Sequence, residues 1–171
     1  MRRILVSIVV AALCLVNAIG HAAQVSQSMN VSLIIGELGG QVTLIVGPLV
    51  LTGSQDGEHV LATGTSTINI TASANLPYTI ALMRGLHWTP GVGRALANSM
   101  GAFLLDYYLY KDAGYTLLWG TDVDPELGTT TSGVGTGNNQ VYTVYGRTLE
   151  YSPALFPSDR YTDVVSVVVD F

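Results

Sequence analysis

The sequence predicts an all-β protein built as a sandwich of two sheets. Apolar and polar residues alternate with a period of two over most of the chain, as they do in half-buried strands. Clusters rich in Gly, Asn, Pro and Ser interrupt these stretches, as in "TGSQDGE", "TPGVGR", "TTTSGVGTGNN" and "YSPALFPSD". Several short strands divided by such clusters are typical of a sandwich or a barrel. With no internal repeat and no linker, we expect one folded domain.

Residues 1–22 have the organisation of a secretory signal peptide. Two arginines precede an apolar stretch at residues 4–16, and small residues follow. This order predicts cleavage after Ala22 or Ala23. A retained membrane anchor is the alternative, although the apolar stretch is shorter than the roughly 20 residues that a spanning helix needs. The single cysteine, Cys14, lies in this segment, so we expect the exported chain to contain no disulfide.

Residues 23–36 are predicted to be an N-terminal extension that contains one amphipathic strand. In "SQSMNVSLII", the apolar residues Met29, Val31, Leu33 and Ile35 alternate with Ser26, Ser28, Asn30 and Ser32. One face of the strand is therefore apolar and the other polar. No turn dipeptide follows closely enough to fold the strand back as a tight hairpin. The strand pairs either within its own domain or with another chain.

The domain itself is expected over residues 37–171. Its first stretch, "QVTLIVGPLVLTG", is apolar on both faces. The Gly47-Pro48 pair there marks an edge, a bulge or, as we favour, a strand that bends and crosses between the sheets. Later strands carry apolar residues at alternate positions: Ile68, Ile70 and Ala72; Tyr78, Ile80 and Leu82; Phe103, Leu105, Tyr107 and Leu109; and the valine-rich residues 161–171. Only "GRALANSMGAFLL" is expected to be briefly helical.

Composition excludes some classes of function. Without the two arginines of the signal segment, the chain has five basic and twelve acidic residues and no basic run, which argues against nucleic-acid binding. Charged residues make up only 11% of the chain and apolar residues 49%. So few charges are unusual on a freely soluble monomer, and we expect part of the surface to be buried against partners.

No pattern of residues predicts catalysis, a cofactor or a metal site. His59 and His87 each lack a second ligand at metal spacing. Asp122, Asp124 and Glu126 alternate in "TDVDPE", but the glycine and final glutamate of a calcium-binding loop are missing. The chain has neither a G-x-S-x-G elbow nor a phosphate-binding glycine loop. We therefore expect no enzyme activity, no cofactor and no metal ion.

Aromatic residues are the remaining signal of binding. They gather at Tyr107, Tyr108, Tyr110, Tyr115 and Trp119. Exposed tyrosines can bind sugars or partner proteins. The alternative, which we favour, is that half of these rings line the core and the rest cover a strand face.

Three blocks near the C-terminus carry a resemblance to a known family. They are "LLDYYLYKDAGYTLLWGTD", "VYTVYGRTL" and "SDRYTDVVSVVVDF". With them the chain resembles the spore coat protein U family, which includes subunits of archaic chaperone–usher pili. The matching positions are Tyr107, Leu109, Tyr110, Asp112, Trp119, Gly120, Val144, Tyr145, Gly146, Arg147, Tyr161, Asp163, Val165, Val167, Val169 and Phe171. Many relatives also have a cysteine pair, which is absent here because Gly36, Glu37 and Ala72 stand in its place.

The resemblance implies an immunoglobulin-like β-sandwich that is incomplete and is completed by donor-strand exchange. The open groove of such a subunit first takes a strand from a periplasmic chaperone and then the N-terminal extension of another subunit. The implied partners are identical subunits, that chaperone and an outer-membrane usher, without nucleic acid or stable membrane insertion. The implied location is the cell surface, reached through the periplasm.

The amphipathic strand at residues 26–35 fits this scheme, so we predict a structural shaft subunit of a pilus or coat filament. The predicted donor-strand side chains are Met29, Val31, Leu33 and Ile35. Two alternatives stay open. A small eight-stranded outer-membrane β-barrel would explain the alternating C-terminal strand, although the two-sided apolar stretch at residues 41–53 does not suit a polar lumen. A spore or cyst coat protein, or a sugar-binding adhesin module, is the second.

Overall fold

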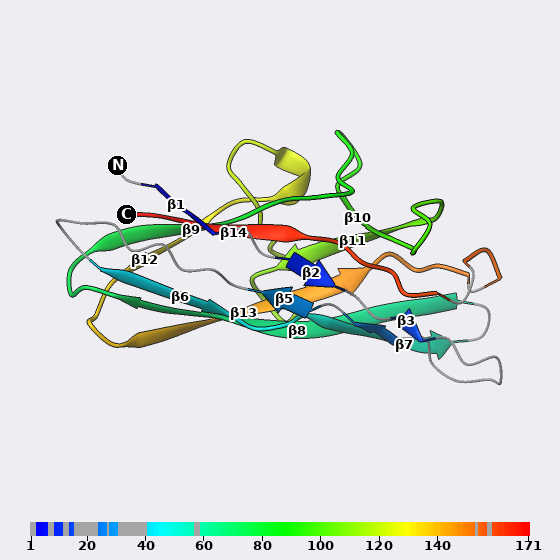
Figure 1. Cartoon of the computed structure of the whole chain (residues 1–171), viewed down its shortest axis with the longest axis horizontal. Helices are drawn as coiled ribbons and strands as arrows, with labels where there is room; N and C mark the ends of the chain where they lie inside the picture. Colours follow the sequence, from blue (N-terminus) through cyan, green and yellow to red (C-terminus); the bar gives the residue numbers. More distant parts are fainter. Residues whose placement is uncertain are drawn as a thin grey trace.

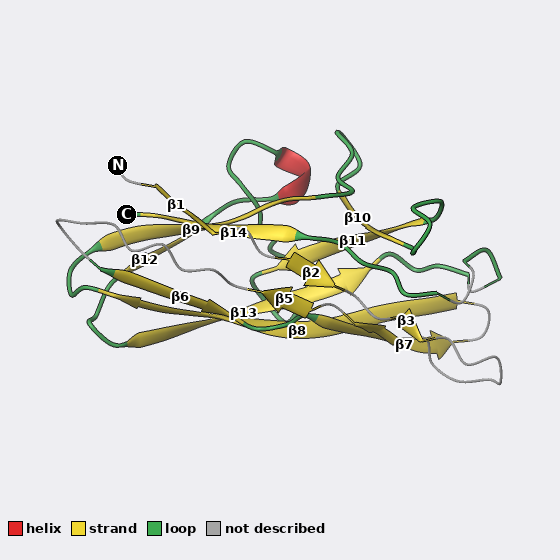
Figure 2. Ribbon diagram, in the orientation of Figure 1, coloured by secondary structure: helices red, strands yellow, loops and turns green. Residues whose placement is uncertain are grey.

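The protein is described by a computed structural model, which covers residues 41–56, 59–152, 154–156 and 159–171 and the backbone of five short strands within residues 1–40. Two sheets lie face to face, and the single helix of these ranges is the 3-10 turn Pro125–Leu127 (Figure 2). The predicted all-β, immunoglobulin-like sandwich is confirmed. None of the described helical structure is long and apolar enough to cross a membrane.

The smaller sheet is antiparallel, with the strand order β1-β14-β9-β12. Its strands are β1 (Arg3–Val6), β14 (Val165–Asp170), β9 (Pro77–Gly85) and β12 (Thr131–Val134). The C-terminal strand β14 therefore lies between β9 and the first strand of the chain. Figure 1 shows this arrangement, with β1 in dark blue beside β14 in red.

The larger sheet has the order β10-β11-β13-β8-β7-β4-β3, and β6 also pairs with β8. Its strands are β3 (Cys14–Leu15), β4 (Gln24–Ser26), β6 (Val42–Val46), β7 (Val50–Asp56), β8 (His59–Ala72), β10 (Arg94–Ala97), β11 (Leu104–Tyr110) and β13 (Asn139–Thr148). A separate two-stranded ladder joins β2 (Val9–Ala11) to β5 (Ser28–Asn30).

The core lies between the two sheets, where the alternation predicts it. The inward residues of β8 and β9, Ile68, Ile70, Ala72, Tyr78, Ile80 and Leu82, are all buried, as are Leu105, Tyr107 and Leu109 of β11. Val165, Val167 and Val169 of β14 close the core from the smaller sheet. Each fully buried apolar side chain of this size contributes roughly 1.5–3 kcal/mol. The core positions predicted from the sequence are confirmed.

The Gly47-Pro48 pair forms a bulge, and the predicted crossing between sheets is wrong. Both β6 and β7 pair with the same strand, β8. Between the pairs Val46–Ile68 and Thr52–Thr63 the register shifts by one residue, as in a β-bulge. The proline lies at this interruption, where the ladder needs no donor.

The expected short helix after Gly93 is also wrong. The residues instead form β10, then a turn, then β11, and β10 pairs with β11 from Arg94–Tyr107 to Ala97–Leu104. All four residues of β10 are buried. A strand buried on both faces has no alternation of apolar and polar residues, so its sequence does not reveal its period.

A salt bridge fixes the 3-10 turn onto β9 and gives a prediction about pH. Arg84 Nε donates to Asp124 Oδ2 at 2.9 Å, a second guanidinium nitrogen contacts Oδ1, and the Arg84 guanidinium lies 3.8 Å from the centre of the Trp88 ring. The hydrogen bond from Arg84 holds the pKa of Asp124 below its ordinary value of 3.8. The carboxylate therefore stabilises the fold above pH 4, and this contribution is lost as the pH falls through the lowered pKa.

We expect Asp124→Asn to lower the melting temperature at pH 7 and to approach the wild type as the pH falls from 4 to 2. Asp106→Asn is the matched control, because burial raises the pKa of Asp106. Its charged form destabilises the fold, so this substitution should leave stability at pH 7 unchanged or increased. Melting curves of the three proteins between pH 2 and 7 measure both effects. A constant difference between Asp124→Asn and wild type over this range would contradict the prediction.

Candidate strand-acceptor edge

The outer edge of β14 is the candidate functional site. In the structure β1 occupies this edge, antiparallel, with Arg3 opposite Asp170 and Val6 opposite Val167. Residues 3–6 belong to the segment that the sequence analysis assigns to a signal peptide. When such a segment is removed, the N–H and C=O groups on this side of β14 have no partner, and an unpaired edge is a template for a strand from another chain.

The face of β14 that points into the core is apolar, whereas its opposite face is mixed, with Ser166, Val168 and Asp170. Val165, Val167 and Val169 point into the core, and each is at most 3% exposed. On the opposite face Val168 lies beside Ala81 of β9, and both are buried. The edge therefore continues directly into the core. A strand added here would place every second side chain against the core and extend the smaller sheet by one strand.

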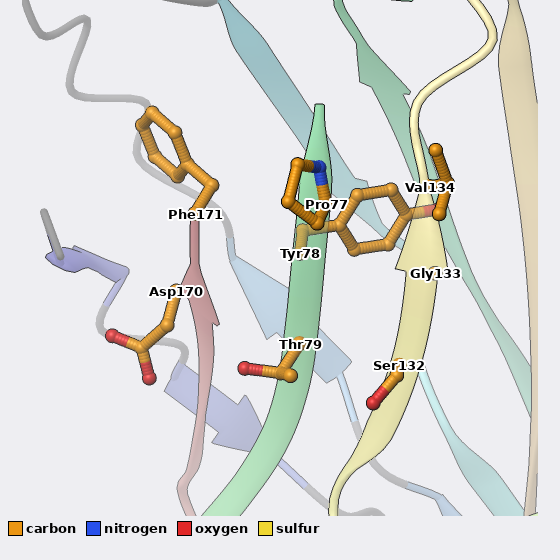
Figure 3. Close-up of a pocket in the computed structure, with 8 residues that line it drawn as sticks. All are labelled: Pro77, Tyr78, Thr79, Ser132, Gly133, Val134, Asp170 and Phe171. Carbon is orange, nitrogen blue, oxygen red and sulfur yellow. The ribbon is translucent and has the colours of Figure 1, made fainter. Parts of the chain in front are cut away.

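An open cavity of about 520 Å³ lies at the end of β14. It is lined by Pro77, Tyr78, Thr79, Ser132, Gly133, Val134, Asp170 and Phe171 (Figure 3). The Tyr78 ring reaches toward β12, and its hydroxyl lies 2.7 Å from that of Tyr142. Burial raises the pKa of Tyr78 well above its ordinary value. A Cβ at Gly133 would lie 2.5 Å from the Tyr78 ring, so only glycine fits beside it.

The family positions Tyr107 and Asp163 join the two sheets. The Tyr107 hydroxyl donates to Asp163 Oδ2 at 2.7 Å, and the backbone N–H of His87 donates to Oδ1 at 3.3 Å. Both side chains are at most 1% exposed. Burial raises the pKa of Asp163, while the hydrogen bond from Tyr107 acts in the opposite direction. Glycine at position 85 provides the space for the Asp163 carboxylate, because a Cβ there would lie 1.8 Å from it.

The Trp119–Gly120 pair anchors the loop before β12 to β9. The indole N–H of Trp119 donates to the Ile80 carbonyl at 3.2 Å, and the N–H of Leu82 donates to the Gly120 carbonyl at 3.1 Å. A Cβ at Gly120 would lie 2.2 Å from the Leu127 carbonyl oxygen. Glycine is therefore required because two backbone segments approach each other closely here.

Several other family positions make contacts within the fold. Asp112 accepts hydrogen bonds from the backbone N–H groups of Thr116 and Leu117, chiefly that of Leu117, and these lower its pKa. Tyr110 lies opposite Tyr145 across the β11–β13 ladder. Gly146, Tyr161 and Phe171 belong to the packing of the core, where a Cβ at Gly146 would lie 2.7 Å from Leu51.

Of the four predicted donor residues, the structure describes the backbone of Met29 alone, and it does not pair Met29 with β14. Met29 lies in β5, opposite Val10 of β2. Val31, Leu33 and Ile35 lie outside the described residues. The start of the predicted extension, Gln24–Ser26, pairs with Val50–Thr52 of β7 as strand β4. The donor strand therefore stays a prediction.

Sequence reasoning missed Arg94, the one fully buried cation of the described residues. It is 1% exposed, and its guanidinium donates to the carbonyls of Met83 at 3.0 Å and Leu82 at 2.5 Å. Desolvation lowers its pKa. The only signal in the sequence was an arginine inside the apolar "GRALA" stretch. Within the described ranges no three His, Cys, Asp or Glu residues gather as a metal site would require.

The class of fold is a two-sheet β-sandwich in which the C-terminal strand pairs with the first strand of the chain and a tyrosine–aspartate hydrogen bond lies in the core. The chain belongs to the spore coat protein U domain family, whose sequence profile matches residues 2–168. The resemblance stated from the motifs is thereby confirmed. No curated protein matches the chain.

A solved structure with a similar fold comes from a bacterial pilus system. It is the crystal structure of the CsuC–CsuE chaperone–tip adhesion subunit pre-assembly complex from archaic chaperone–usher Csu pili of Acinetobacter baumannii. A chain of that complex is 18% identical, with a TM-score of 0.51. The match covers 89% of this chain and 58% of that one, so the present chain spans little more than half the length of its structural neighbour.

Proposed function

We propose that this protein is a structural shaft subunit of an extracellular pilus or coat filament, which polymerises head to tail. In this proposal the signal segment is removed, and the N-terminal extension at residues 23–36 of one subunit lies along β14 of the next. The observation that carries the proposal is the antiparallel pairing of an apolar strand, β1, with the outer edge of β14. An edge that accepts one apolar strand of this chain is suited to accept another.

The donor strand matches that edge in pattern. Met29, Val31, Leu33 and Ile35 share one face and would meet the core beside Val165, Val167 and Val169. At roughly 1.5–3 kcal/mol for each buried side chain, they contribute about 6–12 kcal/mol before the entropy of ordering the extension is subtracted. The cavity lined by Tyr78, Val134 and Phe171 offers space for a further large side chain at the end of the groove.

The geometry of this contact favours a filament. The donor segment and the acceptor edge are different surfaces of the same chain, so each added subunit presents a fresh edge. Such a heterologous contact gives an open polymer unless its rotation closes a ring. An extension that donates a strand distinguishes a shaft subunit from a tip subunit, which needs no donor.

A periplasmic chaperone and an outer-membrane usher are the partners that this proposal requires. An open apolar edge is prone to aggregation until it is covered. A chaperone that lends a strand to β14 would protect it before assembly, and the structural neighbour is itself a chaperone–subunit complex. The usher would then deliver the subunits to the cell surface. Nothing in the site calls for a catalytic role.

Deleting residues 24–35 tests the proposal. The truncated chain should stay folded, because the core residues lie between positions 42 and 169, but it should form no filaments. Negative-stain electron microscopy of exported wild-type and truncated protein gives the readout, with circular dichroism to establish folding. Adding a peptide of residues 24–36 to the truncated chain should raise its melting temperature. Filaments built by the truncated chain would overturn the proposal.

A further inference from the structure

Four tyrosines form a platform on the outer face of the larger sheet, away from the β14 edge. The tyrosine platform consists of Tyr108 and Tyr110 of β11, Tyr115 of the loop that follows, and Tyr145 of β13. Neighbouring ring centres lie 6.4 Å apart from Tyr108 to Tyr110, 5.4 Å from Tyr110 to Tyr115 and 6.5 Å from Tyr115 to Tyr145. All four side chains are half-buried, so the rings are held in place and still reach the surface.

The backbone at Tyr115 is strained to hold this platform together. Its φ is 54°, a left-handed conformation that a bulky residue rarely adopts. Asp112 stabilises the turn by accepting hydrogen bonds from Thr116 and Leu117, and the Tyr115 N–H donates to the Asp112 carbonyl at 3.2 Å. Strained residues persist only where their surroundings determine them, and they gather at functional sites. The strain here places one ring between Tyr110 and Tyr145.

Two charged side chains, Arg147 and Glu150, lie beside the platform. The Arg147 guanidinium lies 5.3 Å from the Tyr115 ring centre. Arg147 and Glu150 both line a cavity of about 330 Å³, together with Tyr108, Tyr110 and Leu149. Within the part of the chain that the structure describes, neither charged group makes a hydrogen bond or ion pair. Every other side of this cavity is built from the tyrosines or from aliphatic side chains and Thr148.

We propose that this cavity binds a pyranose unit of a neutral polysaccharide. The C–H face of a sugar ring packs on an aromatic ring, and each sugar hydroxyl both donates and accepts hydrogen bonds. Arg147 supplies the donors and Glu150 supplies the acceptor. Tyr108 and Tyr110 of the platform supply the aromatic surface. A volume of about 330 Å³ lies at the small end of ligand sites, which suits one or two sugar rings. Glu150 disfavours an acidic sugar by repulsion.

A filament of such subunits would present the same site many times. When a long ligand occupies several individually weak sites at once, its overall affinity is much higher than the affinity of one site. The filament would therefore bind matrix polysaccharide along its length. This inference does not depend on donor-strand exchange, because the platform lies on the opposite sheet from β14.

Isothermal titration calorimetry of the full exported chain tests the proposal, with cellohexaose as the neutral probe and an alginate hexamer as the acidic one. We expect saturable binding of cellohexaose and at least tenfold weaker binding of the alginate hexamer. Tyr108→Ala and Arg147→Ala should each weaken cellohexaose binding about tenfold, whereas Tyr108→Phe, which keeps the ring, should stay within about threefold of wild type. Leu86→Ala, at an exposed position outside the platform and its cavity, is the matched control and should change nothing.

The outcomes are distinguishable from those of the filament proposal. Melting temperatures and electron microscopy should show that the platform variants fold and assemble like wild type. Two results would overturn the proposal: no saturable binding of cellohexaose, or binding that Tyr108→Ala leaves unchanged. Tighter binding of the alginate hexamer than of cellohexaose would overturn the neutral class of ligand.

Discussion

Replacing Val31 and Leu33 together by aspartate should abolish filament formation. In a donor strand these two side chains enter the core of the next subunit beside β14. Each substitution removes roughly 1.5–3 kcal/mol of apolar burial and adds the cost of desolvating a carboxylate. The combined loss exceeds about 5 kcal/mol, which weakens association more than a thousandfold. Electron microscopy and analytical ultracentrifugation of the exported protein measure the effect.

The chain offers a matched control on the opposite face of the same strand. Asn30→Asp together with Ser32→Asp adds the same two negative charges at neighbouring positions, but on the face that the alternation leaves outside the core. This pair should still assemble, with a modest sensitivity to ionic strength. Equal behaviour of the two double variants would show that the strand does not enter a groove by its apolar face.

The family motif could be recognised in the sequence, but its role could not. Trp119, Tyr107 and Asp163 are far apart in the sequence. Only the fold brings the Tyr107 hydroxyl within 2.7 Å of Asp163 Oδ2. Their hydrogen bonds join the two sheets and anchor the loop after β11. These three positions thus stabilise the sandwich, whereas the family positions Tyr110, Tyr145 and Arg147 belong to the proposed tyrosine site and Val165, Val167 and Val169 belong to β14. A motif of this kind identifies the fold more reliably than it identifies a ligand.

Alternation in the sequence predicted the core wherever one face of a strand is buried. It placed Ile68 and Ile70 on the inner face of β8, because Thr67, Asn69 and Thr71 alternate with them, and it placed Ile80 and Leu82 on the inner face of β9. Alternation did not predict β10, because both faces of that strand are buried. It also did not distinguish a bulge at Gly47-Pro48 from a strand that crosses between the sheets, because either can have an apolar sequence. The aromatic residues divided as expected in part: Tyr107 and Trp119 lie in the core, and Tyr108, Tyr110 and Tyr115 lie on a strand face or loop.

Arg94→Ala should be the most destabilising single substitution outside the apolar core. Arg94 is the buried donor for the carbonyls of Leu82 and Met83, and it approaches that of Trp119 at 3.5 Å. Alanine leaves these acceptors without partners and opens a cavity as long as the arginine side chain. Unpaired buried polar groups and cavities together cost about 3–5 kcal/mol. For a domain of this size, that lowers the melting temperature by about 10 °C or more.

Two further variants separate the causes of this loss. Arg94→Met fills most of the space but donates no hydrogen bonds, and it also removes the desolvation that lowers the pKa of the arginine. We expect it to lose about half as much stability as alanine, because a well-packed apolar replacement offsets part of the cost of a buried charge. Arg160→Ala, at an exposed arginine, should change the unfolding free energy by no more than about 0.5 kcal/mol. Differential scanning calorimetry of the four proteins measures the series, and an Arg94→Ala protein as stable as Arg160→Ala would show that β9 and β10 are held together without this guanidinium.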